Sequence, residues 1–146
     1  MYNNDVNLNF FFDSALKNHQ NSNFEEAEKL YKKVIEINPS HFFSTFHLAS
    51  LFAYKKQLVK AEELLNKAIT IRPNYVSAHN NLGGILLQQG KYYESLLSFQ
   101  RATEIDPNHV NARNNLSILL RSLQINKINK NQKTILKKLF LFLFKR

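Results

Sequence analysis

The sequence predicts an all-α solenoid, in which antiparallel helix pairs stack one after another. Three prolines, Pro39, Pro73 and Pro107, follow one another at intervals of 34 residues, and this period is typical of two-helix repeats. Each proline closes a similar phrase, which reads EINPSH, TIRPNY or EIDPNH. Glycine occurs only three times, so the turn residues that a β-sandwich or a β-barrel needs are missing.

The repeat phase divides the chain into six segments. A lead-in of residues 1–7 precedes three full units, which cover residues 8–41, 42–75 and 76–109. A partial fourth unit covers residues 110–124, and a tail of residues 125–146 follows. Because proline disfavours helix at its own position and at the residue before it, the second helix of each unit should end just before its proline. The helices are expected over residues 8–20, 24–37, 42–55, 58–71, 76–89, 92–105 and 110–123.

Apolar and small residues recur within each unit at spacings of three and four, which places them on one face of a helix. In the first helix of unit three they are Leu82, Gly83 and Leu86. Small residues in the second helices should let two helices approach closely. We therefore expect four small side chains to be buried at helix–helix contacts: Ala27, Ala61, Ser95 and Ala102.

These positions resemble the signature of the tetratricopeptide repeat family, W-x2-L-G-x2-Y followed by A-x3-F and P. Unit three matches it as Leu82-Gly83-x2-Leu86, Ser95-x3-Phe99 and Pro107. The usual Trp place is taken by other residues, namely Thr45, His79 and Arg113. The resemblance covers about residues 8–124 and implies a right-handed solenoid that ends in a capping helix over residues 110–124. Within this family, the repeats are most similar in character to the repeat superhelix of O-linked N-acetylglucosamine transferases.

The resemblance also implies a concave groove lined by the first helices, where a peptide segment of a partner protein would bind. The candidate groove residues are Asn9, Phe12, Asp13, Phe46, His47, Ser50, Asn80, Asn81, Asn111, Asn114 and Asn115, and the inward positions are completed by Leu16, Phe43, Ser77, Gly84 and Ile118. The Asn pairs resemble the asparagine ladder of those transferases, because an amide both donates and accepts hydrogen bonds. Since asparagine is frequent throughout this chain, compositional bias is the alternative interpretation.

No pattern in the sequence indicates catalysis. The P-loop, H-E-x-x-H and G-x-S-x-G motifs do not occur, so neither an enzyme nor a bound cofactor is expected. There is no cysteine, and His47 with His79 would lack a third ligand, so no metal site is expected. The family's clamp for a chaperone C-terminal carboxylate needs cations. The matching places lack them, holding Phe12, Leu16, His47, Ser77 and Asn81.

The net charge of +9 belongs to the tail rather than to the repeats. Residues 1–120 hold 12 basic and 11 acidic residues, whereas residues 121–146 hold 8 basic residues and no acidic one. A repeat body that is nearly neutral does not favour nucleic-acid binding. The partner is therefore expected to be a protein, and the oligomeric state stays open.

The tail combines that charge with a cluster of large apolar residues, which includes Ile135, Leu136, Leu139, Phe140, Phe142 and Leu143. Its continuous apolar run, residues 139–144, is far shorter than the ~20 residues of a membrane span. Three interpretations stay open: a helix over residues 134–144 packed on the final units, a contact with an anionic membrane surface, or the start of a longer polypeptide.

The N-terminal sequence lacks the features of a secretory signal, so a cytoplasmic location is expected, with peripheral membrane association as the alternative. The most direct expected function is that of a protein-interaction scaffold. Two other functions stay open: a substrate-presenting module of a glycosyltransferase or sulfotransferase system, and a membrane-surface adaptor that acts through the tail.

Overall fold

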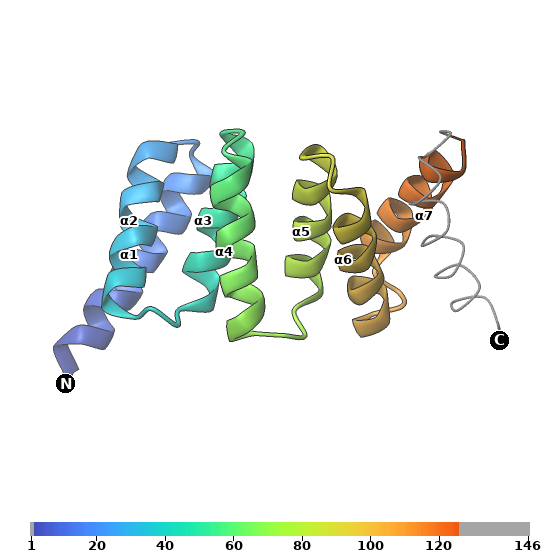
Figure 1. Cartoon of the computed structure of the whole chain (residues 1–146). Coiled ribbons are helices and arrows are strands. Elements are labelled where there is room, and N and C mark those ends of the chain that lie inside the picture. The colour runs from blue at the N-terminus through green and yellow to red at the C-terminus, as the bar shows by residue number, and fades with distance from the viewer. Residues whose placement is uncertain (1, 126–146) are drawn as a thin grey trace.

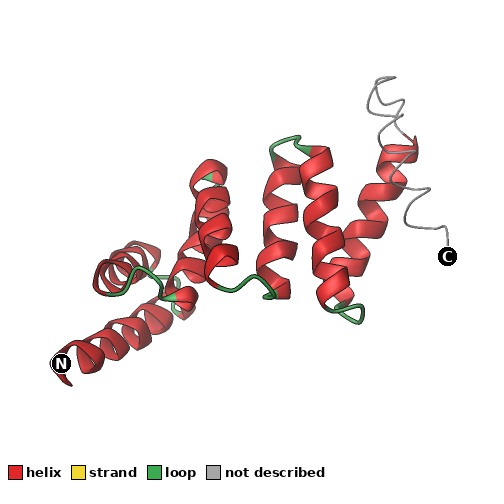
Figure 2. Ribbon diagram, turned by 60° about the horizontal axis from the view of Figure 1, so that its bottom comes forward, coloured by secondary structure: helices red, strands yellow, loops and turns green. Residues whose placement is uncertain are grey.

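Seven helices make up the part of the chain that the structure, a computed structural model, describes, which is residues 2–125 (Figure 1). The helices are α1 (Tyr2–Gln20), α2 (Phe24–Ile37), α3 (Phe42–Tyr54), α4 (Leu58–Ile71), α5 (Val76–Gln88), α6 (Tyr92–Ile105) and α7 (Val110–Ile125). Residues 2–125 contain no strand, as Figure 2 shows. The predicted all-α class is therefore confirmed.

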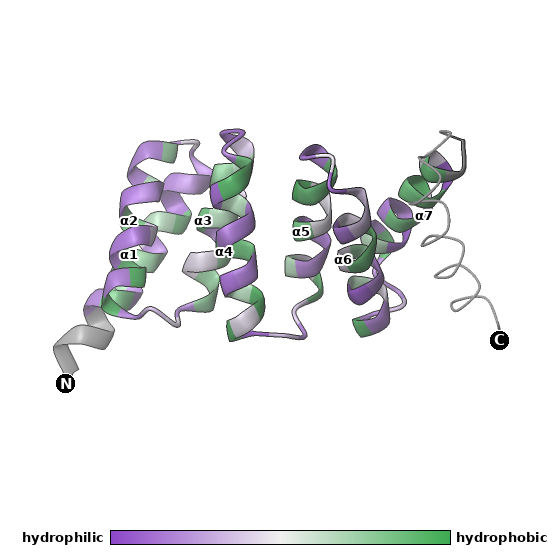
Figure 3. Ribbon diagram, viewed as in Figure 1, coloured by the Kyte–Doolittle hydropathy of each residue, from purple (hydrophilic) through white to green (hydrophobic). Residues whose placement is uncertain are grey.

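The helices form antiparallel pairs that stand in a row, α1 with α2, α3 with α4 and α5 with α6 (Figure 1). Each pair also packs against the next through α2 and α3, α4 and α5, and α6 and α7. The first helices contact one another directly where α3 meets α5 and α5 meets α7. Hydrophobic and hydrophilic residues are interspersed along the helices in Figure 3, as expected for helices with one buried face.

The helix ends follow the repeat period closely. The bounds of α2, α4 and α6 are those expected from the prolines, and α3 and α5 end one residue earlier than expected. The residue before each proline has an extended backbone, with φ of −133° at Asn38, −134° at Arg72 and −136° at Asp106. The expected start of the first helix at residue 8 is wrong, because α1 begins at Tyr2. The segment before residue 8 contains no glycine or proline, so no local residue prevents the helix from extending toward the N-terminus.

The turn between the two helices of each pair has the same geometry in all three units. A left-handed residue stands at equivalent places, with φ of 61° at Ser22, 59° at Lys56 and 75° at Gly90. The next residue then donates its backbone N–H to a carbonyl five residues earlier, which is a Schellman arrangement. The three bonds are Asn23 to Asn18 at 2.8 Å, Gln57 to Phe52 at 2.8 Å and Lys91 to Leu86 at 2.9 Å.

Small side chains hold the two helices of each pair close together. The expected contacts are confirmed, because the side chains of Ala27, Ala61, Ser95 and Ala102 are fully buried. The Ser95 hydroxyl donates a hydrogen bond of 2.7 Å to the carbonyl oxygen of Gly83. Because the helices approach so closely, a buried polar side chain can form its hydrogen bond with the backbone of the facing helix.

Helix α7 is less covered than the first helices before it. At the Trp place of the repeat, Thr45 and His79 are buried whereas Arg113 is exposed. Leu116 and Leu120 are half-buried, although the leucines one repeat earlier are buried. The helix expected over residues 134–144 lies outside the described residues.

Candidate functional site

The candidate groove residues fall into rows, because the same position of successive first helices recurs every 34 residues. One row consists of Phe12, Phe46, Asn80 and Asn114, and the row beside it consists of Asp13, His47, Asn81 and Asn115. The residues of a row come from α1, α3, α5 and α7 in turn. In the first two units the first row carries two phenylalanines and the second row carries Asp13 and His47, whereas both rows carry asparagine in the last two units. The candidate surface therefore has an aromatic half, on α1 and α3, and an amide half, on α5 and α7.

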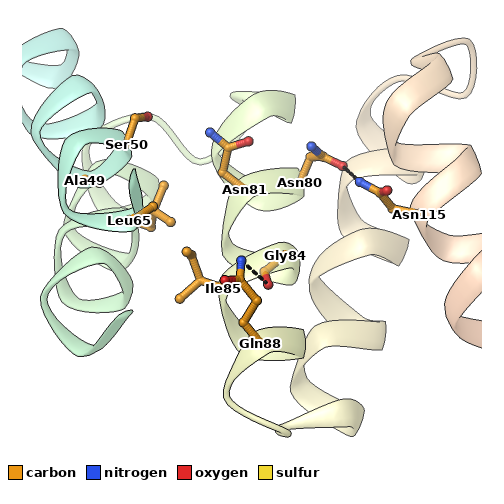
Figure 4. A pocket seen from close by; sticks show the side chains of 10 residues that line it. Ala49, Ser50, Leu65, Asn80, Asn81, Gly84, Ile85, Gln88 and Asn115 are labelled. Carbon is orange, nitrogen blue, oxygen red and sulfur yellow. Dashed lines mark hydrogen bonds between the residues drawn. The ribbon is translucent and has the colours of Figure 1, made fainter. Parts of the chain in front are cut away.

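A cavity of about 340 Å³ lies where the two halves meet, between α3, α5 and α7, with one lining residue from α4 (Figure 4). Its lining residues are Ala49, Ser50, Ala53, Leu65, Asn80, Asn81, Gly84, Ile85, Gln88 and Asn115. Four of the candidate groove residues are thus brought together in one place, namely Ser50, Asn80, Asn81 and Asn115. The other candidate residues do not line this cavity, and Asn9, Asp13, Asn111 and Asn114 are exposed.

One hydrogen bond between two lining residues joins the fourth unit to the third. The Asn115 amide nitrogen donates to the Asn80 side-chain oxygen at 2.9 Å, as Figure 4 shows. Asn115 therefore pairs with the neighbouring row and not with Asn81, the residue that precedes it in its own row. Within residues 2–125 the Asn81 amide has no side-chain hydrogen bond, and its half-buried side chain offers both donors and an acceptor to a ligand.

The aromatic half is built from rings that contact one another across α1, α2 and α3. The Phe12 ring centroid lies 4.8 Å from that of His41 and 6.3 Å from that of His47. The His47 ring stacks on Tyr31 at a centroid distance of 5.8 Å. Phe46 packs against Tyr75 at 5.3 Å. Contacts of this kind hold the rings in fixed orientations, so the aromatic half is a preformed surface.

Burial makes the titratable groups of the aromatic half favour their neutral forms. Desolvation lowers the pKa of His47 below its usual 6.5, and the nearby His19 lowers it further. Desolvation also lowers the pKa of His19 and raises the pKa of Tyr31 to about 12. The His19 Nδ1 atom lies 3.2 Å from the Tyr31 hydroxyl. The centre of this half is therefore uncharged at neutral pH.

The histidines have structural partners that sequence reasoning missed. His47 packs with His19 and Tyr31. The His79 Nε2 atom lies 2.8 Å from the Pro73 carbonyl oxygen. His41 and His109 accept hydrogen bonds through Nδ1 from backbone N–H groups three residues ahead, each at 3.2 Å. Their place just before a predicted helix start was the available signal for this capping role.

Metal binding and membrane crossing find no support in the described part of the chain. Residues 2–125 contain no cluster of three His, Cys, Asp or Glu side chains with which to bind a metal ion. Within the same range, no helix combines the length and the apolar character that crossing a bilayer requires.

Three family models match the chain over its repeats. Models described as Tetratricopeptide repeat match residues 18–41 and 76–109, and a model described as TPR repeat matches residues 49–90. Together the three matches cover residues 18–41 and 49–109, which is more than half of the chain. The chain belongs to the tetratricopeptide repeat (TPR) family. TPR arrays offer extended concave surfaces for binding other proteins, so the fold is that of a protein-interaction scaffold.

Solved TPR domains share the architecture of this chain. The first TPR domain of Spaghetti (RPAP3), bound to the HSP90 peptide SRMEEVD, has a TM-score of 0.77 and 22% identity, and the match covers 82% of this chain and 94% of that one. The second TPR domain of human RPAP3, in complex with the HSP70 peptide SGPTIEEVD, has a TM-score of 0.74 and 18% identity, covering 80% and 97% of the two chains.

An O-GlcNAc transferase is also similar to this TPR array. The Thermobaculum terrenum enzyme matches with a TM-score of 0.74 and 22% identity, over 80% of this chain but only 22% of that one. At such identities these likenesses establish the fold. A comparison with curated protein sequences gives no match.

Proposed function

We propose that this TPR array is a scaffold that binds a peptide segment of a partner protein along α1, α3, α5 and α7. The cavity between α3, α5 and α7 forms the polar centre of the binding surface. The observation that carries the proposal is that Asn80, Asn81 and Asn115, from two successive units, line one cavity of about 340 Å³. This volume lies within the range of cavities that hold ligands.

The amides suit a peptide backbone better than any particular side chain. Among the residues that the structure describes, none bonds to the Asn81 side-chain amide, and a peptide unit offers one donor and one acceptor to such a group. The hydrogen bond between Asn80 and Asn115 holds these two side-chain amides in a defined position. Fixed amides lower the entropy that is lost when a segment binds. The expected ligand is therefore an extended chain whose main chain lies across α5 and α7.

Selection from a peptide display library tests this proposal even while the natural partner is unidentified. Peptides selected on the wild-type protein would be measured by fluorescence anisotropy against an Asn81→Ala/Asn115→Ala double variant. The loss of two hydrogen bonds should weaken binding about tenfold or more. The matched control is Asn66→Ala/Asn108→Ala, which removes two exposed amides away from the cavity and should leave affinity unchanged. Equal affinities for all three proteins, with intact helical circular dichroism, would refute amide recognition.

A second candidate function is the presentation of a protein substrate to a transferase, which the likeness to the O-GlcNAc transferase repeats favours. The two functions differ in what accompanies the array. Affinity purification of the full chain should recover a protein with a transferase domain if the second function holds. If the recovered partners lack such a domain, the second function is refuted and only the scaffold function remains.

A further inference from the structure

Charged residues are absent from the two central first helices but frequent in the second helices. Helices α3 and α5, which carry the centre of the candidate surface, contain no Asp, Glu, Lys or Arg. The second helices α2, α4 and α6 contain seven, four and three such residues. The cavity lining likewise contains no charged side chain. The centre of the candidate surface thus carries no formal charge.

The charged groups nearest to the candidate surface already have partners or lie at its edges. The Arg72 guanidinium carbon lies 4.7 Å from the ring centroids of both Phe42 and Phe43. The Lys56 ammonium lies 3.5 Å from the side-chain oxygen of Gln88, at the rim of the cavity. Asp13 is exposed on α1 at the N-terminal end of the rows.

Other cations near the repeat junctions are paired with acids of the second helices. Lys55 lies 3.0 Å from Glu28, and Lys91 lies 2.7 Å from Glu62. The two glutamates occupy equivalent positions of successive repeats, whereas their lysine partners stand two positions apart in the repeat phase. None of the four side chains lines the cavity. A charged ligand in the cavity would therefore meet no opposite charge among the residues that line it.

We propose that the ligand of this surface is an uncharged, extended segment of a partner protein. Its aromatic, aliphatic or proline side chains contact Phe12, Phe43 and Phe46, and its backbone contacts the amides of Asn81 and Asn115. The inference rests on the proposed function and specifies its partner. A charge moved from water to this surface would lose hydration without gaining a counter-charge, whereas apolar side chains gain from contact with the rings.

This assignment separates the chain from the TPR domains whose structures contain chaperone peptides. The peptides in those two structures end in EEVD, and so carry two glutamates and an aspartate. On this chain an acidic segment would face His47, which is neutral at neutral pH because its pKa is lowered, and the amides of α5. Binding of such a tail in the cavity would place its carboxylates among lining residues that include no cation to form a charge-assisted hydrogen bond.

The composition and the salt response of peptides selected on the full-length protein test the inference. The selected pool should be depleted of Asp, Glu, Lys and Arg relative to the library and enriched in aromatic residues, aliphatic residues or proline. Raising the salt to about 1 M, where the Debye length is about 3 Å, should change the dissociation constant less than about twofold. The peptide SRMEEVD, used as a probe, should not compete with a selected peptide.

Failure of this inference can be told apart from failure of the proposed function. A pool rich in charged residues, salt-sensitive binding or competition by SRMEEVD would overturn the neutral ligand, while peptide binding would stand. A selection that yields no peptide sensitive to the Asn81→Ala/Asn115→Ala change would overturn both.

Two reciprocal substitutions test the division into an aromatic and an amide half. Phe46→Asn gives unit two the residue that unit three has in the same row, and should weaken the selected peptide and reduce the aromatic enrichment of a new selection. Asn80→Phe makes the opposite change at a half-buried position and should increase that enrichment. The second variant keeps the test decisive if Phe46→Asn does not fold. Unchanged selections with either folded variant would overturn the role of the aromatic half.

Discussion

The Phe99 ring packs so closely on Gly83 that a Cβ atom at this glycine would lie 2.6 Å from ring atoms Cδ1 and Cε1. Phe99 is 1% exposed and belongs to the core that α5, α6 and α7 share. Glycine is thus required at this mid-helix position by packing, because the two helices of unit three meet there. The neighbouring Gly84 is a contrast, since nothing lies within 4 Å of the position its Cβ would take.

The two glycines form a matched pair for a stability measurement. Gly83→Ala should lower the free energy of unfolding by about 1–2 kcal/mol, because overpacking exceeds the gain in helix propensity. Gly84→Ala should raise it by up to about 1 kcal/mol, because only the propensity changes. Urea denaturation followed by circular dichroism measures both. Equal effects of the two substitutions would contradict the close contact at Phe99.

Ala61 should be equally intolerant of a larger side chain. It is fully buried where α4 faces α3, so Ala61→Leu should lower the free energy of unfolding by about 1–3 kcal/mol. Glu63→Leu adds an apolar side chain at an exposed position of the same helix and serves as the control, with little expected change. An unaltered melting temperature for Ala61→Leu would argue against the repeat register.

The helices were predictable because their boundaries depend on local rules that repeat. Pro39, Pro73 and Pro107 end the second helices, and the small residues before them identify the packed face. The start of α1 was not predictable, since no residue there stops a helix. The left-handed conformation of Ser22 and Lys56 was also not predictable, because only Gly90 has the residue type that this conformation favours.

Stability should fall on acidification in part because of His47. Its folded-state pKa lies below the usual 6.5, so this contribution is fully present above that value and is lost as the pH falls through the folded-state pKa. His19 and His41 have pKa values shifted in the same direction. Thermal melts from about pH 7.5 to about pH 5.5 should show a smaller loss for His47→Phe than for the wild-type protein. A loss of the same size in both proteins would exclude His47 as a contributor.

The hydrogen bond between Asn115 and Asn80 should be measurable as a coupling between the third and fourth units. A double-mutant cycle with Asn80→Ala and Asn115→Ala should give a coupling energy of about 0.5–1.5 kcal/mol. Asn81→Ala serves as the control, because Asn81 does not bond to Asn115 and its effect should add to that of Asn115→Ala. A coupling near zero for the bonded pair would show that solvent competes fully for these amides.

The tail remains a prediction, and α7 provides its structural context. Leu116 and Leu120 are only half-buried, whereas Leu82 and Leu86 at the equivalent places are 8% and 5% exposed. We expect the deletion of residues 132–146 to lower the free energy of unfolding without changing liposome binding, because the tail's apolar residues would cover this face. Unchanged stability with a loss of liposome binding would instead support a membrane contact.

The candidate site was predictable only as far as it depends on repeat position. The rows of Phe12 and Asp13 follow from the 34-residue period, and four of the expected residues do line one cavity. The pairing of Asn115 with Asn80 depends on the rotation of one unit relative to the next, which no local sequence rule specifies. The packing of His47 on Tyr31 likewise joins residues from different helices, so it emerges only in three dimensions.

The row of helices has a consequence for how the molecule opens. Every substantial packing contact joins helices that are at most two places apart in chain order. Such a chain can fold from local contacts, and one end can unfold while the other stays intact. Amide hydrogens of α7, whose outer face is incompletely covered, should therefore exchange with deuterium before those of α3 and α5, so that the two central helices are the last part of the array to open.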